Sequence, residues 1–150
     1  MTNNYLKRGI ILFWALWFTV VACSDFTSFL QMHQLIPDTF PFNSRNYDLI
    51  AQFLLVYGSH SHFLLQGISV VILLWAVLIA VSFWASFIFK ESDKFAYCAF
   101  NLSFSMTAFF ILVDECFIKY DIEHGHLIRL SVQLLTFLVF MQLTMTKKNS

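Results

Sequence analysis

Residues 114–129 read DECFIKYDIEHGHLIR. Acidic, basic and histidine side chains gather in this stretch, although the residues on either side of it are almost entirely apolar. Gly125 lies near the C-terminal end of the stretch and favours a turn there. The stretch therefore predicts a short polar connection, of about six residues, between two apolar helices that pack as an antiparallel hairpin.

The rest of the chain is too apolar for a soluble domain. Hydrophobic residues occupy 59% of the 150 positions and charged residues only 12%, whereas soluble domains carry about 25% charged residues. The apolar residues form four long runs separated by short polar segments, which is typical of a helical membrane protein with several spans. The net charge is zero and no basic tract is present, so nucleic acid is not an expected partner.

Each of the four runs is long enough to cross the roughly 30 Å apolar core of a bilayer as a helix. We expect spans at about residues 9–30, 63–89, 95–119 and 126–145. Residues 46–58 carry an apolar helical face but are too short to span, so they predict a helix in the membrane interface. The predicted fold is an all-α integral membrane protein. It is one four-transmembrane-helix bundle over residues 1–150, with an additional short interfacial helix in the first outer loop.

A second interpretation applies to the first run. Lys7 and Arg8, followed by an apolar stretch ending in Val20-Val21-Ala22-Cys23, have the arrangement of a bacterial lipoprotein signal, whose processing leaves a lipid on the cysteine. Leucine is usual where Val20 stands, and the stretch is unusually rich in aromatic residues. We therefore expect the run to be retained as a helix, with processing at Cys23 as the alternative.

Basic residues near the spans predict the orientation. Four spans put both termini and the loop at 90–94 on one side, which carries six Lys and Arg residues against three on the other. Because basic residues are enriched on the cytoplasmic side, we expect both termini in the cytoplasm. The 31–61 loop and the 114–129 stretch then face outward. The expected location is a bacterial inner (cytoplasmic) membrane.

Polar side chains inside spans cost free energy and are candidates for function or for helix contacts. On the third span they form two stripes, one through Asn101, Ser105 and Glu115 and the other through Ser103, Thr107 and Asp114. We assign the first stripe to the side of the fourth span, and we expect Asp114 to face elsewhere. The predicted ligand-binding pocket faces outward and is formed by Asp25, Gln66, Glu115, Arg129 and Gln133. The structural alternative is an ion pair of Arg129 with Glu115 or Asp25.

The histidines raise the question of a metal. Residues 123–126 contain Glu-x-x-His, one half of the ferritin-like di-iron signature, and zinc or copper also accepts such ligands. Glu123, His124 and His126 are therefore candidate ligands for a divalent transition metal. A two-metal site needs two such motifs, and the sequence contains this motif only once. We therefore expect no cofactor and treat metal binding as the alternative.

The sequence favours a small, non-catalytic inner-membrane protein that binds a partner protein or lipid through its outer pocket. The expected contacts are the lipid bilayer and a membrane protein partner or a second copy of the chain. The first alternative is a membrane-embedded enzyme or binding protein that acts on a lipid-soluble ligand through outer-leaflet carboxylates, Glu115 or Asp25. The second is metal handling by the outer histidines. No spacing typical of a nucleophilic triad or of a phosphate-binding loop is present, so no catalytic residue is assigned.

The orientation can be tested by labelling single cysteines in a cysteine-free variant. The basic-residue distribution predicts that positions 3 and 149 are cytoplasmic and that positions 43 and 60 are external. A membrane-impermeant thiol reagent should therefore label cysteines at 43 and 60 in intact cells, and those at 3 and 149 only after lysis. Labelling of position 149 but not 43 in intact cells would invert the topology.

Overall fold

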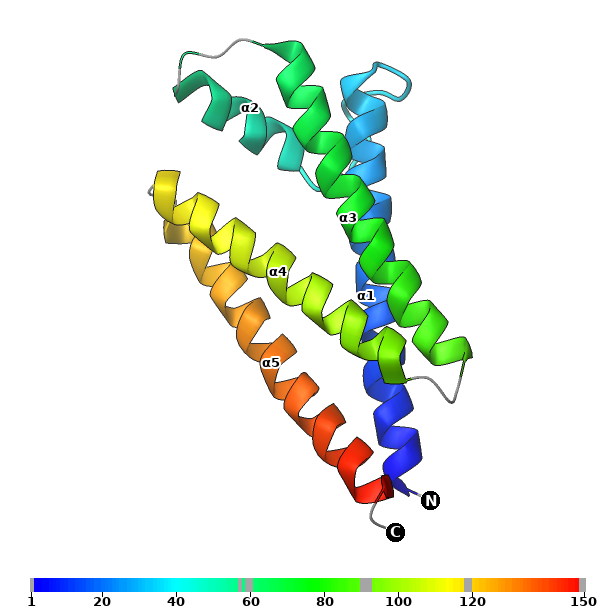
Figure 1. Ribbon diagram of the computed structural model, residues 1–150. Helices are drawn as coiled ribbons and strands as arrows, with labels where there is room; N and C mark the ends of the chain where they lie inside the picture. Colours follow the sequence, from blue (N-terminus) through cyan, green and yellow to red (C-terminus); the bar gives the residue numbers. More distant parts are fainter. Residues whose placement is uncertain (1, 57, 59–60, 90–92, 118–119, 149–150) are drawn as a thin grey trace. The chain divides into compact units, whose positions relative to one another are not determined.

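The computed structural model describes residues 2–56, 58, 61–89, 93–117 and 120–148, and in these residues it contains helices and no strand. Four of the helices are long and apolar enough to cross a membrane, over Asn4–Met32, His62–Ile88, Asp93–Cys116 and Ile122–Thr146. This confirms the prediction of an all-helical chain with four apolar helices of spanning length. In chain order the helices are α1 (Thr2–Met32), α2 (Asn46–Val56), α3 (His62–Ile88), α4 (Asp93–Phe117) and α5 (Tyr120–Lys148) (Figure 1).

The helix α2 is present where the apolar pattern predicts it. Its 11 residues extend about 16 Å, half the thickness of a bilayer core. It buries Ile50 and Phe53 on one side. Gly58 follows the helix with φ of 68°, and its N–H donates to the Leu55 carbonyl at 2.9 Å. This left-handed conformation favours glycine and ends the helix.

The connection between α4 and α5 differs from the prediction. The helix α5 begins at Tyr120 and includes Gly125, so the expected non-helical connection is mostly helical; residues 118–119 lie outside the described residues. A glycine within a helix costs only about 1 kcal/mol relative to alanine. That cost is small beside the contacts of the first turns of α5 with α4, one of which is made by His126.

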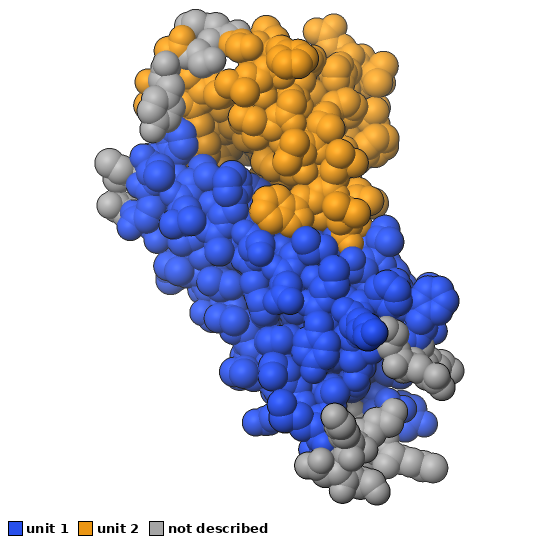
Figure 2. Space-filling model, viewed as in Figure 1, with its two compact units in different colours: residues 1–16, 79–150 blue, residues 17–78 orange. Residues whose placement is uncertain are grey.

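The chain forms two compact units (Figure 2). The hairpin unit comprises Met1–Leu16 and Ile79–Ser150, and the loop unit comprises Trp17–Leu78. The helices α1 and α3 each contribute one end to each unit.

An aromatic cluster forms the core of the hairpin unit. Phe100 of α4 is fully buried. The centroid of its ring lies 5.1 Å from that of Phe83 in an edge-to-face arrangement, 5.0 Å from that of Phe137 and 5.7 Å from that of Phe140. Such ring pairs stabilise beyond their buried area. The cluster therefore joins α3, α4 and α5.

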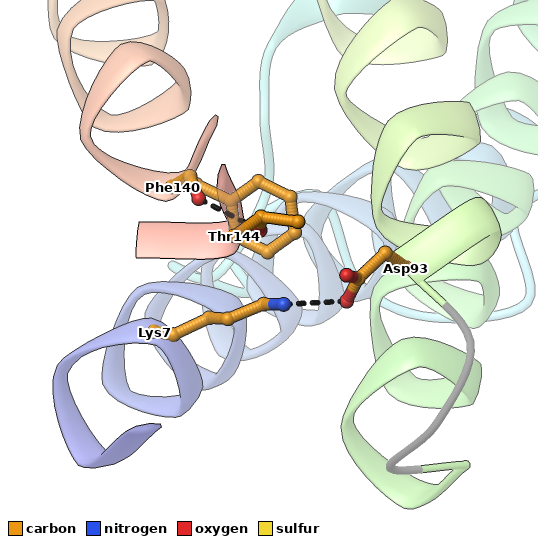
Figure 3. A network of polar contacts seen from close by, with 4 residues as sticks. All are labelled: Lys7, Asp93, Phe140 and Thr144. Carbon is orange, nitrogen blue, oxygen red and sulfur yellow. Dashed lines mark hydrogen bonds and ion pairs between the residues drawn. The ribbon is translucent and has the colours of Figure 1, made fainter. Parts of the chain in front are cut away.

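The N-terminal part of α1 is bound to the same unit by polar contacts. Lys7 Nζ lies 2.6 Å from Asp93 Oδ1 and 4.9 Å from the centroid of the Phe140 ring (Figure 3). On α5, the Thr144 hydroxyl donates to the carbonyl of Phe140, one turn earlier in the same helix, at 2.9 Å. Because Asp93 lies in the first turn of α4, its negative charge is also favourable for the helix dipole.

The loop unit consists of the C-terminal part of α1, residues 33–45, α2 and the N-terminal part of α3. Its apolar core draws on all three helices. On α3 the buried residues are seven and then four positions apart, a spacing that places them on one helical face. The buried apolar side chains of this unit are Phe18, Ala22, Ile50, Phe53, Leu65, Ile72 and Ala76.

Candidate functional site

The five residues of the predicted pocket fall into both units. Asp25 and Gln66 belong to the loop unit, and Glu115, Arg129 and Gln133 belong to the hairpin unit. Asp25 and Gln133 are buried, Gln66 and Arg129 are partly buried, and Glu115 is exposed. Each set therefore has to be read in its own unit.

In the hairpin unit the expected orientation of the α4 carboxylates is wrong. Asp114, only 1% exposed, faces α5 and accepts a hydrogen bond of 2.5 Å from His126 Nδ1. The His126 ring also stacks on Phe110, with 5.4 Å between ring centroids. Glu115 is exposed instead. Asp114, and not Glu115, is thus the acid inside the hairpin.

The reason lies in which polar stripe of α4 packs. Ser103, Thr107 and Asp114 follow the buried Ala96, Ala99 and Phe100 along one face. The small residues allow close approach of α5, and Phe100 supplies the aromatic contacts. The other stripe is exposed at every position: Asn101, Ser105, Ala108, Leu112 and Glu115.

Deeper in the hairpin, Gln133 is fully buried and its Oε1 accepts a hydrogen bond of 3.2 Å from the Thr107 hydroxyl. The same hydroxyl also lies 3.0 Å from the Ser103 carbonyl. No residue in the described part of the chain hydrogen bonds to Gln133 Nε2. If the amide is turned by 180°, its nitrogen donates to Thr107, and one amide atom is still buried without a partner. The glutamine therefore links α4 and α5 through one of its two polar side-chain atoms.

The predicted metal ligands do not converge. Glu123 is partly buried, His124 is exposed, and His126 is directed to Asp114. In the residues that the structure describes, no group of three or more His, Cys, Asp or Glu side chains is placed to hold a metal ion. The histidine of this motif contacts a carboxylate of the neighbouring helix instead.

The richest polar site lies in the loop unit, where residues 33–45 are tied to the end of α1. The buried Asp25 accepts a hydrogen bond of 2.8 Å at Oδ1 from the Asn46 side chain, at the start of α2. One turn further, the Ser28 and Ser44 hydroxyls are 3.1 Å apart, and the Ser44 N–H donates to Ser28 Oγ at 3.1 Å. These bonds fix both the end of the loop and the first residue of α2.

The start of the loop is held in the same way. Gln31 Nε2 is 3.2 Å from the Pro37 carbonyl, 3.3 Å from the Asp38 carbonyl and 3.1 Å from the Phe40 carbonyl. Thr27 donates its hydroxyl hydrogen to the Phe42 carbonyl. Loop carbonyls thus have α1 side chains as partners, which gives a segment without regular structure a defined path.

Between the end of α1, the 33–45 loop and the start of α2 lies a polar cavity, here called the chamber. It is a cavity of about 500 Å³, within the range of small-molecule sites. A second cavity of about 10 Å³ shares Ser28 and Tyr47 with the chamber and includes Asp25; it is about large enough for one water molecule. The chamber is lined by Ser28, Gln31, Met32, Gln34, Asp38, Asn43, Arg45, Tyr47 and Asp48.

Two of the lining residues have an unusual backbone conformation. Gln34 has φ of 57° and Arg45 has φ of 54°, a left-handed region that costs a residue with a side chain about 1–2 kcal/mol. Strain of this kind persists where the surroundings determine the backbone, and it is common at functional sites. The two positions lie at either end of the loop that forms the chamber.

The prediction included Asp25 but missed the chamber, which shares Ser28 and Tyr47 with the small cavity at Asp25. A signal was present: Ser24, Thr27, Ser28 and Gln31 recur at helical spacing as a polar stripe at the end of α1. Such a stripe predicts a polar contact partner for this face. The partner, residues 37–44, follows directly in the sequence, but the carbonyls that meet each side chain depend on the fold of the loop.

Comparisons of this chain with protein-family models, with curated proteins and with solved structures found no match. Its function is therefore argued from its own residues.

The Asp25–Asn46 bond should stabilise the loop. Asp25→Ala leaves the Asn46 amide without this acceptor and should lower the free energy of unfolding by about 1–3 kcal/mol. It should also speed proteolytic cleavage within 33–45 in detergent-solubilised protein. Asp38→Ala, which removes an exposed carboxylate from the same loop, is the control and should leave stability unchanged. Equal cleavage rates in the two variants would contradict this role for Asp25.

The orientation of the α4 carboxylates gives a second prediction. Asp114→Ala removes the buried acceptor of His126 and should destabilise the protein by about 1–3 kcal/mol. Glu115→Ala changes an exposed neighbour and should stay within about 0.5 kcal/mol. Unfolding of the two variants in detergent mixtures of rising denaturing strength measures both values. A larger loss for Glu115→Ala would reverse the assignment.

Proposed function

We propose that the protein is an integral membrane protein without catalytic activity that binds the polar head of an amphiphilic molecule in the chamber of its loop unit. In this proposal α1, α3, α4 and α5 span the bilayer, both termini are cytoplasmic, and the loop unit's chamber faces outward, into the periplasm of a bacterium. The observation that carries the proposal is the chamber itself, a cavity of about 500 Å³ with a mostly polar lining beside apolar helices.

The spanning helices are supported by length and composition. Four helices have stretches of 24 to 29 residues that are apolar enough to cross a membrane, and such stretches reach about 36–44 Å. Large apolar side chains are exposed along them, for example Leu74, Leu78 and Leu135. Lipid tails would cover these side chains, whereas the exposure of so many of them to water would be unfavourable.

The helix α2 supports a site at the level of the head groups. One of its sides is buried through Ile50 and Phe53, while Leu55 and Val56 are 54% and 74% exposed. A short helix with apolar residues on its free side suits the boundary between head groups and tails. Because the chamber includes Tyr47 and Asp48 of α2, a ligand with its head in the chamber could lay its apolar part along this helix.

The Asp114–His126 pair favours a second candidate function, an enzyme acting on a lipid-soluble ligand. A carboxylate that holds Nδ1 of an imidazole leaves Nε2 to accept a proton or a hydrogen bond, as in a general base. This function would depend on the hairpin unit and not on the chamber. The following test separates the two.

Filling the chamber should release the ligand. Met32 lines the chamber, and its thioether sulfur is only a weak hydrogen-bond acceptor, so Met32→Trp adds volume without removing a strong polar group. We expect this variant to fold and to lose most of the lipid that co-purifies with the wild type. The measurement is mass spectrometry of lipids extracted from protein purified in mild detergent.

The control is His33→Trp, which adds similar volume at the adjacent, exposed position outside the lining of the chamber. Its lipid content should equal that of the wild type. Unchanged lipid content in Met32→Trp would rule out the chamber as the binding site.

A further inference from the structure

Arg45 is an unexpected residue for its position. It has φ of 54°. A Cβ atom strains the backbone in that conformation, so glycine is common there, and asparagine is tolerated because its short side chain can form local hydrogen bonds. Arg45 is also exposed. In the described part of the chain, no ion pair or hydrogen bond of its guanidinium group compensates for the strain. The folded chain alone therefore gives no reason for arginine here.

The neighbours of Arg45 force this conformation. On one side, the Ser44 N–H is bonded to Ser28 Oγ of α1. On the other, the Asn46 side chain is bonded to Asp25 of α1, while the Arg45 carbonyl accepts from the Leu49 N–H at 3.2 Å as α2 begins. With both flanking residues held, the backbone at 45 has no freedom to relax. The Arg45 side chain thus starts from a fixed backbone position in the lining of the chamber.

The charges of the chamber define what it can receive. Among the described residues that line it, Arg45 carries the positive charge, and Asp38 and Asp48 are acidic. A guanidinium group binds phosphate with two parallel hydrogen bonds. Two carboxylates suit a cationic group, and they disfavour a ligand that carries only negative charge. The lining therefore matches a ligand with a phosphate and an ammonium group.

We propose that the chamber binds the zwitterionic head group of an aminophospholipid such as phosphatidylethanolamine, with Arg45 on the phosphate and Asp38 and Asp48 on the ammonium group. Arg45 also directly precedes the first turn of α2, and a helix N-terminus favours an anion. This inference rests on the proposed function, because it assigns a ligand class to the same chamber.

The strain at Arg45 makes a sharp test possible. Arg45→Gly relieves the backbone and removes the guanidinium group, so it should raise the melting temperature of the ligand-free protein while weakening binding at least about tenfold. Arg45→Lys keeps the positive charge but loses the planar guanidinium group that makes two parallel hydrogen bonds. This variant should therefore bind the lipid with intermediate affinity. Gln34→Gly is the matched control, because it relieves the same strain in the same chamber and keeps Arg45. It should raise the melting temperature as Arg45→Gly does, which checks the strain argument without removing the guanidinium group.

Binding is measured by native mass spectrometry of delipidated, full-length protein in detergent, titrated with single lipids. Phosphatidylethanolamine should bind better than phosphatidylglycerol, which lacks the ammonium group, and better than diacylglycerol, which lacks the phosphate. Soluble glycerophosphoethanolamine, added as a competitor, should displace the lipid only weakly; equally tight binding of this compound would assign the site to a free head group rather than a lipid.

Two results would overturn the inference: wild-type binding of phosphatidylethanolamine by Arg45→Gly, or equal binding of all three lipids by the wild type. If Met32→Trp still abolished lipid retention, the chamber would bind lipids without distinguishing their head groups. In that case only the proposed ligand class would be wrong. If neither Met32→Trp nor Arg45→Gly had an effect, the proposed function itself would fail.

Discussion

A polar side chain buried in an apolar helix must find its partner inside the protein, and this constraint shapes both units. In the loop unit the partner of Asp25 is Asn46, which is 21 positions away in the sequence. In the hairpin unit Asp114 is bonded to His126 and Gln133 to Thr107. An unpaired buried carboxylate or amide would cost several kcal/mol, so a helix face that carries such a side chain can be buried only where a partner meets it.

The same constraint accounts for the ordered path of the loop. Residues 33–45 have few backbone partners of their own, yet their carbonyls have to be satisfied next to apolar helices. The end of α1 supplies donors from Thr27 and Gln31. A loop held this way can line a polar cavity and can keep Arg45 in a left-handed backbone conformation. Binding capacity and loop stability thus have a common origin in α1.

The hairpin unit shows how one helix can offer two polar faces of which only one packs. Both stripes of α4 carry small and polar residues and one acid, so helical periodicity alone does not show which stripe is buried. Packing separates them, because the stripe through Ser103 and Thr107 continues from the buried Ala96, Ala99 and Phe100. The aromatic contacts of Phe100, about four turns before Asp114 along α4, therefore favour burial of Asp114 rather than Glu115.

The sequence alone determined the helical class, the four apolar helices and the short helix α2, because the length and periodicity of apolar runs are local properties. It also identified Asp25 and Gln133 as polar residues of interest, because a polar residue within an apolar run is visible without a fold. It did not determine that α5 begins at Tyr120 and continues through Gly125, since a glycine's small helix cost is outweighed by tertiary contacts. Nor could it reveal the partners of Asp25 and Asp114 or the chamber around Arg45. Those depend on which carbonyl, amide or ring meets each side chain, and only the packed structure sets these distances.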